Sequence, residues 1–160
     1  KICWIMCAFS TKWDMPYLGP FLTFIFILLH LIIVKFEKRD IKIISLALLI
    51  GFIIDSIFFQ FNLINYQGGI LAEFKLAPLW ILSMWAGFSV TLLYGLDSIK
   101  KRYFISGVLG LIGGPLSYNA GVQIGSIMLN GLLSYILLGI VWGLIIPILF
   151  YCINRIETNA

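Results

Sequence analysis

A single carboxylate lies deep inside an apolar stretch of this 160-residue chain. Asp55 occurs in "GFIIDSIFFQFN", residues 51–62, where no cationic residue is close to it in sequence. If this segment crosses a bilayer, burying an ionisable side chain there costs about 2.5–3.5 kcal/mol, so such residues usually mark a functional site. The carboxyl group could act as an acid or base, bind a ligand, or hold helices together through hydrogen bonds. We expect Asp55 to face the interior and to be partly protonated at neutral pH, because burial disfavours its charged form.

Other polar and aromatic side chains should lie at a similar depth or further toward the outer surface. Counting about 1.5 Å per residue along each apolar run places Thr23, Ser83, Ser117 and Tyr118 near the level of Asp55. We therefore expect an outward-facing polar pocket formed by Asp55, Gln60, Trp80, Ser117, Tyr118, Asn119 and Gln123. The alternative is that the outermost of these residues belong to an ordinary surface in the lipid-headgroup region.

The remaining reactive residue types do not form a recognisable catalytic set. His30, the single histidine, should lie about 12 Å shallower than Asp55, so we interpret it as an interfacial or packed side chain. A proton relay between the two residues would need an intervening group. Cys3, Cys7 and Cys152 lack the spacing of a zinc site and are interpreted as small apolar side chains. We expect no metal and no cofactor, and an enzyme that uses Asp55 as acid or base is less favoured than a non-catalytic protein.

A second unusual stretch is "GGPLSYNAG", residues 113–121, within an otherwise apolar run. Pro115 lacks a backbone N–H and so frees the carbonyl of Leu111, four residues earlier. In lipid that carbonyl must be satisfied, and broken helices are tolerated where they line a cavity. We predict a helix break at Pro115, with Tyr118 and Asn119 turned toward Asp55. The alternative is a proline kink that only shapes the bundle.

Small residues four positions apart let helix backbones approach closely. The chain has three such glycine pairs, Gly110 with Gly114, Gly121 with Gly125, and Gly139 with Gly143. They predict that the last two helices pack tightly against each other.

The elements that carry these residues are predicted from hydrophobicity. The chain is 61% hydrophobic and 11% charged, whereas a soluble domain has about 25% charged residues. A transmembrane helix needs about 20 apolar residues, and four runs are long enough, at residues 17–34, 43–64, 76–96 and 132–153. Two shorter runs cover residues 2–10 and 103–118, and the second can be extended to Ala120. We predict an all-α, polytopic membrane helical bundle of about six transmembrane helices, with residues 1–160 forming a single domain.

The basic residues predict how such a bundle is oriented. With six spans, nine basic residues fall on one side, Lys1, Lys35, Lys38, Arg39, Lys42, Lys100, Lys101, Arg102 and Arg155, and two on the other, Lys12 and Lys75. The positive-inside rule then places both termini in the cytoplasm. Loop lysines account for the net charge of +4, so we expect no nucleic-acid partner. Because the chain begins at Lys1 and not at methionine, we expect earlier residues that complete the first span, and no cleavable signal is visible.

Four ordered blocks, "WDMPYLGP", "LLIGFIIDS", "LAPLW" and "GLIGGPLSYNAG", carry a resemblance that extends from about Trp4 to Pro147. The chain resembles a family of short bacterial inner-membrane proteins catalogued as domain of unknown function twenty-eight seventy-eight (DUF2878). The matching positions are Asp55, Pro78, Trp80, Gly114, Pro115, Tyr118, Gly121 and Gly125. Members are often encoded near cyclopropane-synthase-like methyltransferases, so the resemblance implies a role in envelope lipid metabolism. It assigns no catalytic residues.

Three functions remain open at this point. The first is a multi-pass protein of the bacterial inner membrane that handles a lipid or a small amphipathic molecule in the pocket near Asp55. The second is a scaffold or transporter subunit that binds partner helices of another membrane protein through its glycine-rich faces. The third, which we favour least, is a membrane enzyme.

Overall fold

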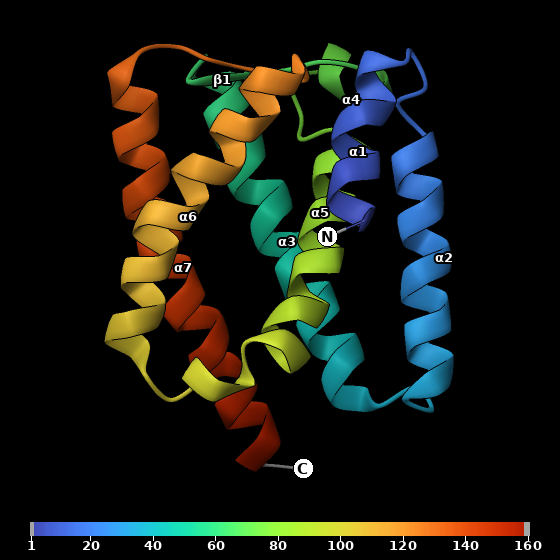
Figure 1. The fold of residues 1–160 in the computed structure, drawn as a ribbon, viewed down its shortest axis with the longest axis vertical. Coiled ribbons are helices and arrows are strands. Elements are labelled where there is room, and N and C mark those ends of the chain that lie inside the picture. The colour runs from blue at the N-terminus through green and yellow to red at the C-terminus, as the bar shows by residue number, and fades with distance from the viewer. Residues whose placement is uncertain (1, 159–160) are drawn as a thin grey trace.

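The computed structural model describes residues 2–158, which form seven α-helices and a two-stranded ribbon (Figure 1). In chain order the elements are α1 (Ile2–Lys12), α2 (Leu18–Ile33), α3 (Lys38–Gln60), β1 (Ile64–Tyr66), α4 (Ile70–Glu73), α5 (Leu79–Val90), α6 (Tyr103–Ile124), β2 (Ile127–Leu129) and α7 (Leu132–Thr158). A π-helical turn, η1 (Thr91–Gly95), continues α5, and a 3₁₀ turn, η2 (Asp97–Ile99), follows it. The all-α class predicted from the sequence is confirmed.

The helices follow the predicted apolar runs, with differences at their ends. α3 begins at Lys38, five residues before the predicted start, and Asp40 in its first turn favours a helix there because the amino end of a helix carries partial positive charge. α6 continues to Ile124, past Tyr118 and past the extension to Ala120. By length and composition, α3 and α7 are able to cross a membrane, whereas α1, α2 and α5 with η1 are apolar but shorter.

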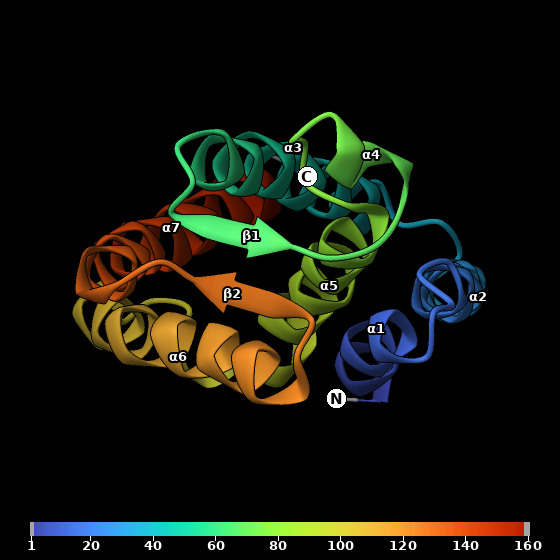
Figure 2. The ribbon, with the colours of Figure 1, turned by 90° about the horizontal axis from the view of Figure 1, so that it is seen from above.

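The ribbon is a feature that the sequence analysis did not predict. β1 pairs antiparallel with β2, so that Ile64 faces Leu129 and Tyr66 faces Ile127. Figure 2 shows the two strands lying across one end of the bundle, between α3 and α6. Strands of three residues from distant parts of the chain are too short to give a periodic signal. The ribbon matters for the site because it carries Tyr66 and covers this end.

The basic residues gather at the two ends of the bundle as the charge pattern predicted. The α2–α3 turn, the segment between α5 and α6, and the carboxyl end of α7 share one end (Figure 1). There Arg39 and Lys100 both form ion pairs with Glu157. Lys75, whose ammonium donates to Asn62 Oδ1, lies at the opposite end. Lys1 lies outside the described residues.

The predicted tight packing of the last two helices is confirmed. A Cβ atom on Gly110 would overlap the backbone of Trp142, and one on Gly143 would lie 3.4 Å from the carbonyl oxygen of Gly107. Gly139 is also close to α6, because a Cβ there would lie 3.0 Å from the carbonyl oxygen of Leu111. The backbones of α6 and α7 are therefore in direct contact along the glycines.

One of the three glycine pairs has a different role. Gly121 makes room for the side chain of Ile127 in β2, whose Cδ1 would lie 2.7 Å from an added Cβ. Gly125 is the residue that ends α6, with φ of 92° in the left-handed region that glycine tolerates best. The prediction that Gly121 and Gly125 pack against a second helix is therefore wrong.

The predicted helix break at Pro115 is also wrong, because α6 is continuous through this residue. The carbonyl of Leu111, which Pro115 leaves without its usual donor, lies against Gly139 of α7. A helix backbone this close can offer a weak Cα–H donor. Close packing by α7 thus accommodates the proline within a continuous helix.

Candidate functional site

The carboxylate of Asp55 accepts hydrogen bonds from three side chains that belong to three other elements. Tyr66 Oη of β1 and Tyr118 Oη of α6 each lie 2.5 Å from Oδ1. Trp85 Nε1 of α5 lies 2.6 Å from Oδ2. Asp55 is fully buried, so its interior position, predicted from the sequence, is confirmed, while its protonation state stays a prediction. With both oxygens occupied, the carboxylate fixes α3 relative to α5, α6 and the ribbon.

Neighbouring aromatic rings position Tyr66 so that its hydroxyl reaches Asp55. The Tyr66 ring is edge-on to Phe59 and Trp80, with centroid distances of 5.3 Å and 6.1 Å. Trp80 Nε1 donates to the carbonyl oxygen of Gln67, 2.8 Å away, and so ties the chain after β1 to α5. The end of the bundle under the ribbon is therefore a closed layer of aromatic side chains.

Two indole rings lie beside this layer, each against a glycine. Trp85 and Trp142 stack with centroids 4.7 Å apart and an interplanar angle of 14°. A Cβ on Gly51 would overlap the ring of Trp85, and a Cβ on Gly114 would overlap that of Trp142. Within residues 2–158, Trp142 Nε1 is the buried side-chain nitrogen or oxygen atom that lacks a hydrogen-bond partner.

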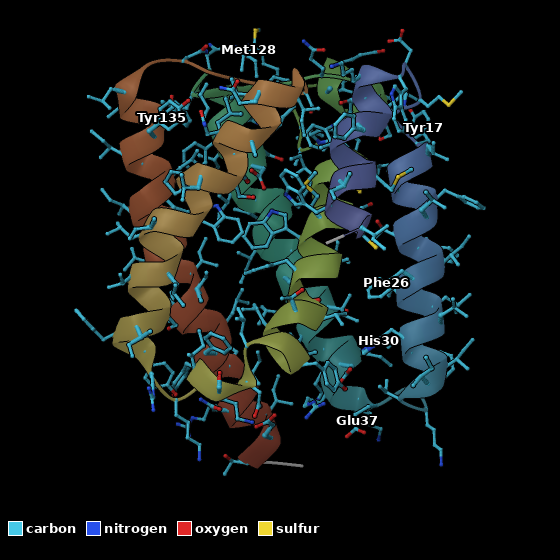
Figure 3. The ribbon with its side chains drawn as sticks, viewed as in Figure 1. Tyr17, Phe26, His30, Glu37, Met128 and Tyr135 are labelled. Carbon is cyan, nitrogen blue, oxygen red and sulfur yellow. The ribbon has the colours of Figure 1, made fainter. Side chains whose placement is uncertain are left out.

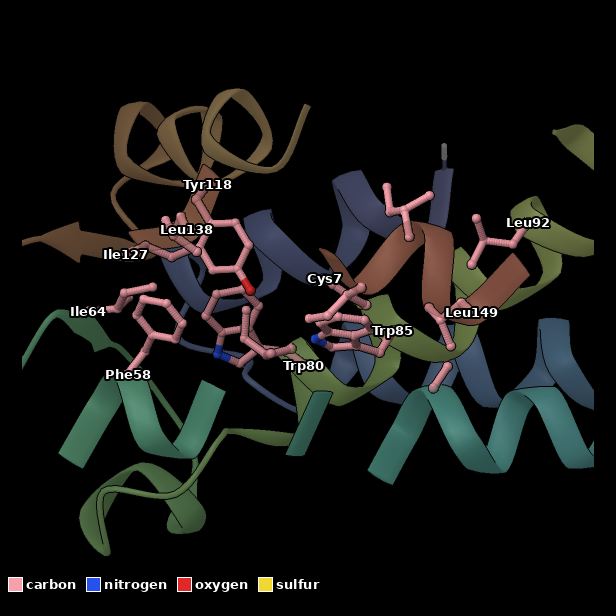
Figure 4. Packing of buried hydrophobic residues seen from close by; sticks show 14 of the residues in the cluster. Cys7, Phe58, Ile64, Trp80, Trp85, Leu92, Tyr118, Ile127, Leu138 and Leu149 are labelled. Atoms are coloured by element: carbon pink, nitrogen blue, oxygen red, sulfur yellow. The ribbon is translucent and has the colours of Figure 1, made fainter. Parts of the chain in front are cut away.

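Next to these rings lies a cavity of about 300 Å³. Side chains of α5, α6 and α7 form most of its wall, with contributions from α1 and β2. Six of the lining residues are aromatic: Trp4, Trp80, Trp85, Phe88, Tyr118 and Trp142. Figure 4 shows Tyr118 and Ile127 close to Trp80 in this part of the core. No charged side chain from the described part of the chain lines the cavity.

Asp55 is close to the cavity but is not part of its wall. Trp85 and Tyr118 both line the cavity and both donate to the carboxylate. Their rings stand between Asp55 and the cavity, and the aspartate itself has no exposed surface. The arrangement therefore suits a residue that orients two wall side chains. It does not present an acid or base to a bound molecule.

The structure brings together some of the predicted pocket residues and separates others. Trp80, Ser117 and Tyr118 line the cavity beside Asp55. Gln60 and Gln123 are exposed and lie outside it. Asn119 is half-buried, but its Oδ1 accepts from Tyr135 Oη of α7, 3.0 Å away, at the ribbon end of the bundle (Figure 3). The cavity is consequently apolar, which corrects the prediction of a polar pocket.

The other side chains expected at the depth of Asp55 also have different partners. Thr23 Oγ1 lies 3.4 Å from Cys7 Sγ, within the contact between α1 and α2. Ser83 Oγ donates to the carbonyl oxygen of Leu79 in its own helix. Of the four residues placed near Asp55 by depth, Tyr118 is the one that contacts it. Depth along a helix does not determine which way a side chain points.

Sequence reasoning missed three residues of this site. Tyr66 lies outside all the predicted apolar runs, in a strand only three residues long. Trp85 and Trp142 lie in apolar runs where an aromatic side chain is more often an anchor at the interface. One available signal was the presence of glycines at Gly51 and Gly114, since glycine inside a helix costs about 0.5–1 kcal/mol relative to alanine and usually has a packing reason.

The chain matches one known protein family. Residues 1–148 match the model of a family described as a protein of unknown function, DUF2878. The chain belongs to this family. No curated protein and no solved structure is significantly similar to it.

The DUF2878 match contains all four sequence blocks that carried the resemblance. In the structure, three of these blocks meet around Asp55. The block in α3 supplies Gly51 and Asp55, the block at the start of α5 supplies Trp80, and the block in α6 supplies Gly114 and Tyr118. Three of the four blocks that carried the resemblance thus contribute to the cavity wall and its support.

A second polar cluster lies at the basic end of the bundle, around the fully buried Asp40 of α3. His30 Nε2 of α2 lies 2.7 Å from Asp40 Oδ2, and Tyr94 Oη of η1 donates to the same oxygen at 2.8 Å. Arg39 Nε donates to Oδ1 at 3.1 Å. Figure 3 shows His30 near this end. His30 therefore pairs with Asp40, as a packed histidine, and no relay to Asp55 is present in the described structure.

Ion pairs extend this cluster to α7. Glu157 accepts from Arg39 and from Lys100, and Lys100 also pairs with Asp97, 2.7 Å away. The hydrogen bonds from Lys100 to Asp97 and Glu157 raise the pKa of its ammonium group. Together with the hydrogen bonds to Asp40, these ion pairs join α2, α3, the η1–η2 segment and α7 at the basic end.

Proposed function

We propose that this protein lies in the bacterial inner membrane as a multi-pass bundle of six apolar helices, with its basic end in the cytoplasm. Its outward faces support this location, because large apolar side chains such as Phe24 in α2 and Phe104 in α6 are 65% and 84% exposed. Soluble monomers rarely expose large continuous apolar patches. The concentration of basic residues at one end supports the orientation.

The function we propose is to hold a lipid or another small amphipathic molecule, through its apolar part, in the cavity beside Trp85 and Trp142. The observation that carries the proposal is a cavity of about 300 Å³ with aromatic walls inside the bundle. Ligand sites are commonly concave, mostly apolar and lined by aromatic side chains with few polar groups. A role in an envelope-lipid pathway, implied by the family resemblance, is consistent with such a ligand.

In this proposal Asp55 shapes the site and takes no part in chemistry. Its hydrogen bonds hold Trp85 and Tyr118 at the cavity wall. Because the carboxylate is buried behind them, we do not propose an enzyme that uses it as acid or base. The scaffold hypothesis loses its supporting feature as well, since Gly110 and Gly139 are already used for the contact between α6 and α7.

Tryptophan fluorescence offers a direct test. Four of the five tryptophans line the cavity, Trp4, Trp80, Trp85 and Trp142, whereas Trp13 is exposed. The protein, purified in a mild detergent, is titrated with a long-chain fatty acid that is brominated along its chain, because bromine quenches nearby indoles. We expect saturable quenching in the natural protein.

A matched pair of variants separates binding in the cavity from general partitioning. Ser117→Phe places a ring in the cavity, whereas Leu116→Phe changes the neighbouring side chain, which is 63% exposed and does not line it. Saturable quenching should disappear in Ser117→Phe and persist in Leu116→Phe. If both variants and the natural protein are quenched alike and without saturation, the proposed function is wrong.

A further inference from the structure

The cavity is elongated along the helix axes. On α6 its lining extends from Leu109 to Gly121. These residues are twelve positions apart, which corresponds to about 18 Å at 1.5 Å per residue. The hydrocarbon core of a bilayer is about 30 Å thick, so the cavity is slightly longer than the apolar part of one leaflet. Its long direction is also that of the lipid chains around a membrane-spanning helix.

The end of the cavity under the ribbon is closed. Ile127 of β2 lines this end, is 4% exposed and fills the space beside Gly121. Just beyond it, Ser126 Oγ donates to the carbonyl oxygen of Ala8, 3.1 Å away, which joins the start of β2 to α1. None of the exposed polar residues at the outer end, such as Gln123, lines the cavity. An opening toward the outer aqueous side, as expected from the sequence, is therefore not what the described residues form.

The side of the cavity facing away from α3 is open. Leu109 and Gly113 of α6 both line it and are both exposed, Leu109 to 48%. Trp4 of α1, which is half-buried, also lines the cavity. An added Cβ on Gly113 would meet nothing within 4 Å, so there is open space directly in front of this residue.

We infer that the ligand is a bilayer lipid, one of whose acyl chains enters sideways from the hydrocarbon core, past Gly113, while its headgroup stays outside the cavity. This inference rests on the proposed function and specifies its ligand. A lateral opening at residues that face hydrocarbon admits a chain already dissolved there. Because Gly113 has no side chain, nothing on α6 blocks the opening at this position.

The lining and the volume of the cavity both favour an acyl chain over a headgroup. A charged headgroup inside the cavity would lack a partner, since no charged side chain of the described residues lines it, and burying an unpaired charge is costly. Ligand pockets usually measure about 300–1,000 Å³, and this cavity of about 300 Å³ is at the lower limit. The cavity suits part of one acyl chain and is too small for a whole phospholipid.

Two photoreactive phosphatidylethanolamines distinguish chain from headgroup. One has a diazirine near the end of an acyl chain, and the other has it on the headgroup. The protein is reconstituted with each lipid in vesicles and irradiated, and the labelled residues are located by mass spectrometry. We expect the chain probe to label residues of the cavity wall such as Met84 and Trp85, and the headgroup probe to label neither. Labelling of these residues by the headgroup probe would overturn the inference.

The role of Gly113 is tested with the chain probe. Gly113→Leu fills the opening, so labelling of Met84 should fall several-fold, and Gly113→Ala should give a smaller loss. Ile112→Phe is the matched control, because Ile112 is 55% exposed on the same helix and does not line the cavity. Labelling by the chain probe should be unchanged in this control.

The outcomes separate the inference from the proposed function. If Gly113→Leu keeps full labelling of Met84 while Ser117→Phe loses saturable quenching, a molecule binds in the cavity but does not enter past Gly113. In that case the inference is wrong and the proposed function stands. If the chain probe labels only the outward faces of the natural protein and quenching is not saturable, both are wrong.

Discussion

At the scale of single residues, Asp55 shows how one side chain can organise several elements. Three buried donors depend on its two oxygens, from Tyr66, Trp85 and Tyr118. A buried donor that loses its partner costs about 1–3 kcal/mol. The importance of Asp55 therefore comes from the groups that it would leave unpaired, two of which form the cavity wall.

Asp55→Leu should lower the free energy of unfolding by several kcal/mol, because it removes the acceptor of three buried donors at about 1–3 kcal/mol each. Asp55→Asn keeps one acceptor oxygen and should have an intermediate effect. Both are measured by unfolding the purified protein in increasing denaturing detergent. Tyr135→Phe is a control, since it removes one partly buried hydrogen bond and should cost only about 0.5–1.5 kcal/mol. A leucine variant as stable as the natural protein would contradict the assigned role.

Asp40 has the same kind of role at the basic end. Its carboxylate accepts from His30, Arg39 and Tyr94, and it is fully buried. We expect Asp40→Ala to destabilise the protein by about 1–3 kcal/mol or more, because buried donors lose their acceptor. Tyr94→Phe should cost less, since one donor is removed together with its need for a partner. The same unfolding assay compares the two, and equal stabilities of all three proteins would show that the cluster is idle.

At the scale of elements, adjacent glycines on α6 have opposite surroundings. Gly114 is pressed against the side chain of Trp142, whereas Gly113 faces open space. Gly114 therefore sets the distance between α6 and α7, and Gly113 leaves the cavity open. Their contrast separates the packing role of glycine from its effect on helix propensity.

Gly114→Ala should destabilise the protein by about 1–3 kcal/mol, because an extra methyl group overpacks the contact with Trp142. Gly113→Ala should instead stabilise it by about 0.5–1 kcal/mol, since alanine favours a helix and meets nothing there. Thermal unfolding followed by circular dichroism compares the two variants. The packing argument fails if they shift the unfolding temperature equally and in the same direction.

At the scale of the whole molecule, the two ends of the bundle differ in charge, and only one of them is covered by the ribbon. One end carries most of the basic residues and the polar cluster around Asp40, and the other carries the ribbon. In a membrane, such an asymmetry sets the orientation. The proposed orientation places the ribbon outside the cytoplasm.

Cysteine labelling in intact cells tests this orientation. Met128 in β2 is 53% exposed at the ribbon end (Figure 3). Lys38, at the start of α3, and Lys101, just before α6, are exposed at the basic end. A membrane-impermeant maleimide should label Met128→Cys, but Lys38→Cys and Lys101→Cys only after the cells are opened. The unsubstituted protein, which contains three cysteines, provides the background. Labelling of Lys38→Cys from outside would reverse the proposed orientation.

The sequence by itself determined the helices, the grouping of the basic residues, the interior position of Asp55 and the close contact of the last two helices. These follow from hydrophobicity, from charge and from the spacing of small residues along one helix, which are local properties. The tertiary structure alone decided which side chains reach Asp55, because Tyr66, Trp85 and Tyr118 come from three distant elements. It also decided that α6 stays unbroken at Pro115, since the freed carbonyl of Leu111 meets Gly139 of another helix. Finally, the cavity is apolar because the rings of Trp85 and Tyr118 lie between it and Asp55. A pattern along the sequence does not specify which side chain shields another in space.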